Sequence, residues 1–287
     1  MKRHVPTLRG NTPQCGVALI AVLWIVAALG ILVTGMVQSQ RDEIRIVATA
    51  RDALQASAIG GGATQLVLQK ISLRPEAADR LSRMEVEYAG LNIAVEVMPL
   101  NGLVDINKAS EQLLAALFAV AGGLPVDAAA GLARNLAASR LPGQGRTTGP
   151  RYEAVEDLLQ LPGVDFDLYA RLSSIVTTDA AGSGRVNPLA APPGVLAVLA
   201  NGNSARSASV AAARDAGKPG VDTTNLSAEF VDNSVSTRFR LQARVPLADG
   251  RWLLSTRTVN AAKDATRGLP WRILHSEDRV EPFPATN

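Results

Sequence analysis

The chain has 287 residues, of which 47% are hydrophobic and 19% are charged, with a formal net charge of +3. This composition predicts a folded protein, and the small basic excess argues against nucleic-acid binding as its main role. The single cysteine, Cys15, lies ahead of the first apolar run, so no internal disulfide is expected and no thiol chemistry is predicted for the mature chain. About 250 residues follow that run, enough for one large domain or two small ones.

A basic leader and a charge-free apolar run open the chain. Lys2, Arg3 and Arg9 precede Gly16, and residues 17–37 read VALIAVLWIVAALGILVTGMV. About 20 apolar residues in a helix cross a bilayer core of about 30 Å, so a membrane-spanning helix is predicted. The basic leader predicts a cytoplasmic N-terminus and places the bulk of the chain in the bacterial periplasm.

Gly16 stands before the apolar run, whereas a secretory signal has its cleavage site after one. Cleavage after Gly16 would remove residues 1–16 and leave Val17 as the first residue of the mature chain. An ordinary signal anchor that tethers an unrelated periplasmic enzyme is the alternative reading of the same run.

The N-terminal helix is expected to continue beyond residue 37. Residues 38–71 contain no proline, and an apolar stripe recurs at helical spacing, whereas Pro75 predicts the end of the helix. Gly60-Gly61-Gly62 interrupts the helix, at about 1 kcal/mol per glycine relative to alanine. We expect these glycines to mark a close contact between the helix and a sheet.

Two groups of strands are predicted far apart in the sequence. Residues 84–88 and 91–97 alternate apolar and polar side chains around a reversal at Ala89-Gly90, which predicts a hairpin with one buried face. Residues 238–245, 252–259 and 271–277 predict further strands. Because a lone hairpin is marginally stable in water, the early pair is expected to join the late strands in one sheet.

The stretch from residue 107 to 214 is alanine-rich and predicts helices. Ser110 and Asp127 are expected to cap helices that end near residues 120 and 139. Further helices are predicted at 153–161, from a cap at Asp165 to residue 176, and at 193–199.

Within this helical stretch there is a weak internal repeat. Residues 102–109 read GLVDINKA and residues 184–190 read GRVNPLA. Asn107 and Asn187 are expected to fix loops through side-chain bonds to the backbone, and we favour this structural role over a binding one.

The predicted fold class is α+β, with a long N-terminal helix packed on an antiparallel sheet and a large all-α insertion of helix-hairpin-helix (SAM-like) type. We expect a leader at 1–16, a transmembrane part at 17–37, and a periplasmic helix with the first strands at 38–100. The inserted helical domain is expected at 101–232 and the remaining strands at 233–287.

Few side chains suggest catalysis. The histidines are His4 in the leader and His275 in a predicted strand, and no Gly-x-Ser-x-Gly, phosphate-loop or dinucleotide-binding motif occurs. A zinc site is not expected. Asp222, Glu229 and Asp232 lie in a polar stretch that favours a solvated loop, with a structural Ca²⁺ site as the alternative.

One motif supports a DNA-binding alternative. Residues 158–165 (LLQLPGVD) resemble a helix-hairpin-helix, and residues 117–123 (LFAVAGG) form a looser second copy. In DNA-binding hairpins a Gly-x-Gly backbone approaches phosphate, but here Asp165 occupies the second glycine position. Its negative charge disfavours that contact, so a membrane-anchored DNA receptor of the competence type is the runner-up.

The whole pattern resembles the type IV pilin-like proteins, and within them the K-type minor pseudopilins of type II secretion. The residues that carry the resemblance are Gly16-Val17 with the apolar run, Leu100-Asn101-Gly102 leading to Asp105-Ile106-Asn107, Leu161-Pro162-Gly163, and Arg185-Val186-Asn187-Pro188 leading to Ala191-Pro192. Most pilin-like proteins have Glu at the fifth mature position. This chain has Ala21 there, and the K-type subunit is the family member that lacks the Glu.

The resemblance implies a non-enzymatic subunit at the tip of the periplasmic pseudopilus, which initiates or caps assembly during export of folded proteins across the outer membrane. It implies cleavage after Gly16 by a prepilin peptidase and N-methylation of Val17. It also implies the I- and J-type minor pseudopilins, other pseudopilins and the inner-membrane assembly platform as partners. No cofactor is required by this reading, although family members bind calcium.

Overall fold

The computed structural model describes residues 15–74, 78–140, 152–218, 220–262 and 270–282, with the backbone alone for 15–18 and 31–45. Residues 1–14 of the leader and Pro75 therefore lie outside the described residues. The chain divides into two compact units between residues 54 and 55. The first unit contains the N-terminal part of helix α1 (Cys15–Leu73), and the second contains the rest of α1 and all other elements.

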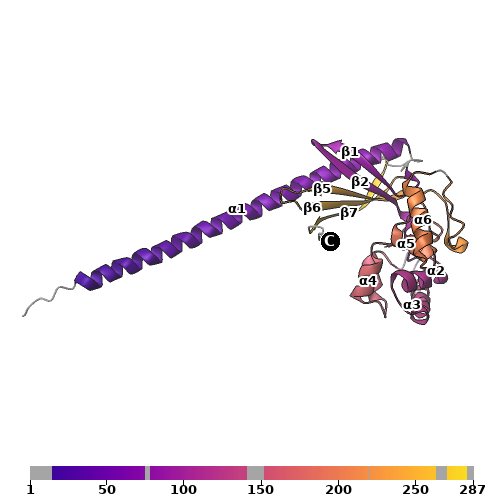
Figure 1. The fold of residues 1–287 in the computed structure, drawn as a ribbon, viewed down its shortest axis with the longest axis horizontal. Coiled ribbons are helices and arrows are strands. Elements are labelled where there is room, and N and C mark those ends of the chain that lie inside the picture. Colours follow the sequence, from indigo (N-terminus) through magenta and orange to yellow (C-terminus); the bar gives the residue numbers. More distant parts are fainter. Residues whose placement is uncertain (1–14, 75–77, 141–151, 219, 263–269, 283–287) are drawn as a thin grey trace, which may run out of the picture. The chain divides into compact units, whose positions relative to one another are not determined.

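The second unit holds a five-stranded antiparallel sheet (Figure 1). Its strands are β1 (Ser82–Tyr88), β2 (Leu91–Pro99), β5 (Arg238–Pro246), β6 (Trp252–Asn260) and β7 (Arg272–Glu281), in the order β1-β2-β5-β6-β7. Strands β1 and β2 are joined by Ala89 and Gly90, whose φ angles of 52° and 76° suit a tight hairpin turn. The expected pairing of the early hairpin with the late strands is confirmed by the β2–β5 ladder.

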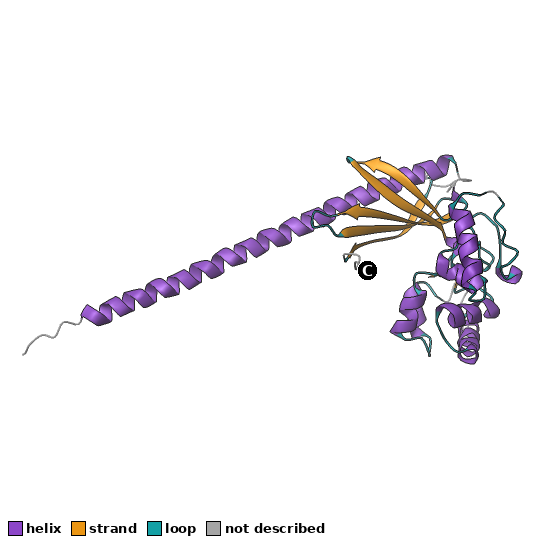
Figure 2. Ribbon diagram, viewed as in Figure 1, coloured by secondary structure: helices purple, strands orange, loops and turns teal. Residues whose placement is uncertain are grey.

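The residues between β2 and β5 form the helical elements and a small second sheet (Figure 2). The helices are α2 (Glu111–Ala116), α3 (Val126–Ser139), α4 (Phe166–Leu172), α5 (Pro193–Leu199) and α6 (Ser204–Asp215). Shorter helical turns are η2 (Leu100–Gly102), η3 (Leu117–Ala121), η4 (Val155–Gln160) and η5 (Ala228–Phe230). Strands β3 (Val104–Asp105) and β4 (Val176–Thr177) pair in parallel.

The helical region differs from the sequence expectation in several details. Pro125, not Asp127, precedes α3, because proline pre-sets the extended backbone of that position, and Asp127 lies in the first turn. The helix capped by Asp165 ends at Leu172 rather than near residue 176, since Val176 and Thr177 are taken up by pairing with β3. Residues 155–160 form a tighter 3₁₀ turn, and helix α6 was not expected from the sequence.

A large apolar core holds the helical region together. It includes Phe118, Leu113, Leu114, Leu136 and Leu168, each at most 2% exposed. Met98 of β2 belongs to the same cluster, and Leu81 N–H donates to Leu189 O at 3.0 Å. The helical region and the sheet are therefore packed against each other through apolar and backbone contacts.

The C-terminal part of α1 lies on one face of the sheet. A Cβ added to Gly60 would lie 2.6 Å from Ser255 Cβ, and one added to Gly62 would lie 2.3 Å from the Tyr88 ring, whereas one at Gly61 would meet nothing within 4 Å. This confirms the expected close contact between the glycine run and a sheet. The absence of side chains at Gly60 and Gly62 lets the helix backbone approach the strands.

A polar cluster adds to this apolar contact. Ser57 Oγ of α1 donates to Asp278 Oδ2 at 2.5 Å, and Arg257 Nη1 donates to Asp278 Oδ1 at 2.7 Å. Burial tends to raise the pKa of Asp278, but the bonds from Arg257 and Ser57 lower it below its usual value. Asp278 thus ties the last strand both to β6 and to α1.

Candidate functional site

The first unit presents an apolar surface on every side of a helix. Between residues 19 and 30, which we call the apolar segment, all described side chains are exposed. The large ones are between 56% and 74% exposed, namely Leu19, Ile20, Val22, Leu23, Trp24, Ile25, Val26 and Leu29. Successive residues are about 100° apart around a helix, so these side chains surround it completely.

Gly16 and Val17, the predicted processing residues, lie in the first turn of α1. Ala21 lies exposed in the apolar segment, so the segment carries no carboxylate at that position. A search of the described residues finds no helix with both the length and the apolar character needed to cross a membrane.

The two asparagines of the internal repeat bond to backbone atoms. Asn107 Nδ2 donates to the carbonyls of Tyr152 and Thr178, each at 2.8 Å. Asn187 Oδ1 accepts from Leu189 N–H at 3.0 Å. The expectation that these asparagines fix loops through backbone bonds is confirmed.

A carboxylate, Asp105, lies buried where the first copy of the repeat meets β4. The residue is 1% exposed, its Oδ1 accepts from Asn107 N–H at 2.9 Å, and its Oδ2 accepts from Ala180 N–H at 3.0 Å. Burial raises the pKa of Asp105, and the two N–H bonds oppose this rise only in part. Sequence reasoning did not single out this residue for a structural role, because its burial depends on contacts with residues about 75 positions away.

We expect Asp105→Asn to destabilise the protein by about 1–3 kcal/mol, because an amide has one acceptor oxygen for two buried N–H donors. Because the folded pKa of Asp105 is raised, the wild-type carboxyl binds its proton more tightly when folded, and its contribution to stability rises as the pH falls through that pKa. The difference between wild type and variant should therefore widen from pH 7 toward pH 4. Urea unfolding of both proteins across this range would measure it, and a difference that narrows would contradict the assignment.

Two helical hairpins pack against each other in the helical region. In the first, η3 and α3 are joined through Gly122 and Gly123, and in the second, η4 and α4 are joined through Pro162 and Gly163. Gly123 and Gly163 have φ angles of 69° and 97°, where glycine avoids the strain of a side chain. These are the two hairpins identified in the sequence.

The second hairpin has a feature that opposes phosphate binding. Asp165 Oδ1 accepts from Leu168 N–H at 2.7 Å and so caps α4 as expected. A phosphate at this helix start would meet a carboxylate in its place. The local geometry therefore disfavours the DNA-receptor alternative.

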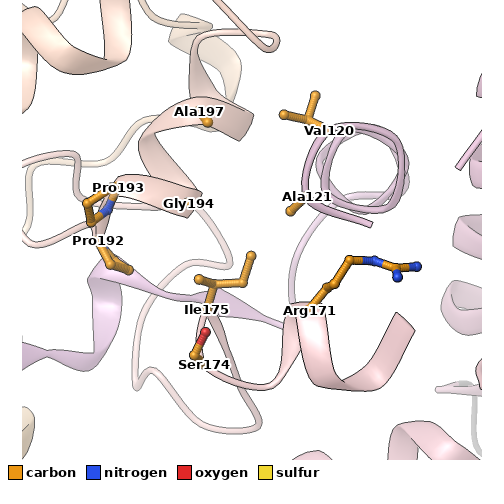
Figure 3. Close-up of a pocket in the computed structure, with 9 residues that line it drawn as sticks. All are labelled: Val120, Ala121, Arg171, Ser174, Ile175, Pro192, Pro193, Gly194 and Ala197. Carbon is orange, nitrogen blue, oxygen red and sulfur yellow. The ribbon is translucent and has the colours of Figure 1, made fainter. Parts of the chain in front are cut away.

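A pocket of about 490 Å³ opens between η3, α5 and the chain after α4 (Figure 3). Val120, Ile175, Pro192 and Pro193 give it a largely apolar lining. The charged head of Arg171 points away from the two prolines in Figure 3, and Arg171 Nε donates to Gly122 O at 3.0 Å. No histidine or carboxylate is among the lining residues, so this pocket offers no acid–base pair.

Two of the carboxylates considered as calcium ligands, Asp222 and Asp232, accept hydrogen bonds from different residues. Asp222 accepts from Thr224 Oγ1 and N–H at 2.6 and 2.9 Å, and these bonds lower its pKa. Asp232 accepts from Ser183 Oγ at 2.6 Å, and that bond is the main cause of its lowered pKa. Within the described parts of the chain, no three side chains of His, Cys, Asp or Glu gather as metal ligands. Calcium binding therefore stays a prediction. The histidine of the predicted last strand, His275, lies exposed in β7 opposite Thr258.

Comparisons with known proteins give a structural likeness. No protein-family model matches the chain, and no curated protein matches it. Among solved structures, it is similar to a chain in the crystal structure of the GspK-GspI-GspJ complex from the type 2 secretion system of enterotoxigenic Escherichia coli. The sequence identity is 15%, the match covers 83% of this chain and 99% of that chain, and the TM-score is 0.49.

Proposed function

We propose that the protein is a minor pseudopilin at the tip of a type II secretion pseudopilus, where it initiates or caps assembly for export of folded proteins across the outer membrane. It acts as an assembly factor rather than an enzyme. Residues 17–37 anchor it in the inner membrane with a cytoplasmic N-terminus and a periplasmic bulk. Its partners are the I- and J-type minor pseudopilins, the other pseudopilins and the inner-membrane assembly platform.

The observation that carries the proposal is the apolar segment directly after Gly16-Val17. A helix that is apolar on all sides is stable only when lipid or other helices surround it. Because Gly16 precedes the apolar segment, cleavage there removes the basic leader and retains the apolar segment. A pseudopilin needs this order, since the same helix first holds the subunit in the membrane and then packs against other subunits.

Ala21 supports the placement at the tip. In a stack of pilin-like subunits, a Glu at this position is proposed to neutralise the N-terminal amine of a neighbouring subunit inside an apolar core. A buried amine without a partner is costly, so internal subunits gain from that Glu. A tip subunit has no earlier subunit whose amine it must meet, and an uncharged residue there is tolerated.

The two alternatives receive less support. A periplasmic enzyme on a signal anchor would need a site with nucleophilic or acid–base groups, and neither the pocket nor the exposed His275 provides one among the described residues. A DNA receptor would need hairpins that accept phosphate, and the carboxylate of Asp165 opposes that.

Replacing Gly16 by leucine tests the processing step on which the proposal depends. Gly16→Leu is expected to leave residues 1–16 attached, so that intact-mass measurement of protein from its native host gives the full-length chain. Gly10→Leu changes a leader glycine away from the junction and is the matched control, which should still yield a chain that begins at Val17. A Gly16→Leu protein of normal mature mass, or a wild-type N-terminus other than Val17, would overturn the proposal.

A further inference from the structure

The two hairpins of the helical region have equivalent tips. We call residues 122–127 the first tip and residues 162–167 the second tip. In each, a glycine of positive φ is followed by a partly buried apolar residue, Leu124 or Val164. A residue of extended conformation then precedes a helix, Pro125 before α3 and Asp165 before α4.

Each tip presents a large apolar side chain to solvent at the same place. Val126 and Phe166 are the first residues of α3 and α4, and both are 76% exposed. In the described part of the second unit, these are two of the most exposed large apolar side chains. A single exposed apolar residue needs no explanation, but the same exposure at equivalent positions of two packed hairpins indicates a contact surface.

The tips belong to one packed pair because each contacts the other hairpin. A Cβ at Gly122 would lie 2.7 Å from Leu168 Cδ1 of α4, and a Cβ at Gly163 would lie 3.5 Å from Leu132 Cδ1 of α3. Arg171 of α4 also bonds to Gly122 O. The second helix of each hairpin therefore lies against the tip of the other.

The charge of the tips limits what they can meet. Asp127 and Asp167, both exposed, directly follow Val126 and Phe166, and neither tip contains a basic residue. In residues 111–140 and 152–172, acidic residues outnumber basic ones although the whole chain is positive. Nucleic acid and anionic lipid are disfavoured by this sign, whereas a surface with basic side chains around an apolar centre is complementary to it.

We propose that the two tips form one docking surface for a protein partner that presents basic side chains around an apolar site. Val126 and Phe166 enter the apolar part of the partner, and Asp127 and Asp167 face its basic side chains. This surface is separate from the apolar segment of α1, and the proposal holds whether or not the chain is a pseudopilin.

Two helical peptides of equal length, one of leucine and lysine and one of leucine and glutamate, are suitable probes. Full-length protein in a neutral detergent is immobilised, and peptide binding is measured by surface plasmon resonance. The leucine–lysine peptide is expected to bind, and Val126→Ser or Phe166→Ser should each raise its Kd by about tenfold, which corresponds to about 1.4 kcal/mol of lost apolar burial. Asp127→Asn and Asp167→Asn should raise the Kd less and reduce its dependence on salt.

Matched controls lie outside the hairpins. Val235 is 62% exposed and Asp222 is exposed, so Val235→Ser and Asp222→Asn should leave the Kd unchanged. All six substitutions are at exposed positions and should preserve the unfolding midpoint. Equal loss in the control variants, equal binding of the leucine–glutamate peptide, or no binding of either peptide would overturn the proposal. If the chain dimerises and Phe166→Ser abolishes the dimer, the occupant of the tips would be a second copy of the chain and not a basic partner. If the tips bind anionic vesicles, the assignment of a basic protein partner would also be wrong.

Discussion

Gly184→Ala is expected to destabilise the protein by about 2–5 kcal/mol, the largest effect we expect for a change of one methyl group. Gly184 has a φ of 87°, a conformation that strains any residue with a side chain by about 1–3 kcal/mol. Its Cβ would also lie 2.3 Å from the backbone oxygen of Lys108. Because a backbone atom cannot move aside as a flexible side chain does, a steric cost adds to the conformational strain.

The control for Gly184→Ala is Gly217→Ala. Gly217 has a φ of 65° but nothing lies within 4 Å of its Cβ position, so the variant carries the conformational strain without the clash. A loss of about 1–2 kcal/mol is expected there. Urea unfolding of the two variants separates the cost of the conformational strain from the cost of the clash with Lys108. Equal losses would show that Lys108 does not restrict position 184.

Gly184→Ala also perturbs the contact between the two copies of the internal repeat. Gly184 begins the second copy and contacts Lys108 near the end of the first, while Gly102 begins the first copy and its Cβ would lie 2.1 Å from Ala190 O at the end of the second. The two copies therefore contact each other reciprocally. The glycines occur at both starts because each faces a backbone carbonyl of the other copy.

Gly60→Ala is expected to destabilise the protein by about 1–3 kcal/mol, because its methyl group would overlap Ser255 Cβ at a fully buried position of β6. The helix would have to move away from the sheet along its contact. Gly61→Ala is the matched control, since its methyl group meets nothing, and it should stabilise α1 by up to about 1 kcal/mol through helix propensity.

Gly62→Ala should fall between these two variants. Its methyl group would meet the far end of the Tyr88 ring, and Tyr88 is 39% exposed and free to rotate outward. In thermal or urea unfolding, Gly60→Ala should be the least stable of the three variants, Gly62→Ala intermediate and Gly61→Ala the most stable. If Gly60→Ala were as stable as Gly61→Ala, the close approach of α1 to β6 would be wrong.

The sequence by itself determined the features whose signals are local. Alternation of apolar and polar residues predicted β1, β2, β5 and β6, and Ala89-Gly90 predicted the turn between the first two. Ser110 and Asp165 were recognisable as helix caps, because a cap bonds to an N–H three residues further along the chain. The apolar segment after Gly16 and the glycine run at 60–62 were also readable without coordinates.

The tertiary structure alone decided the features that depend on distant partners. Val176 and Thr177 form β4 only because Val104 and Asp105 lie beside them, and this pairing ends α4 earlier than its periodicity predicts. Asp105 became a buried acceptor through Ala180, and packing between the hairpins placed each tip against the second helix of the other hairpin. Contacts between residues far apart in sequence leave no periodic pattern along the chain, so the sequence specifies the elements and packing selects which of their side chains remain exposed.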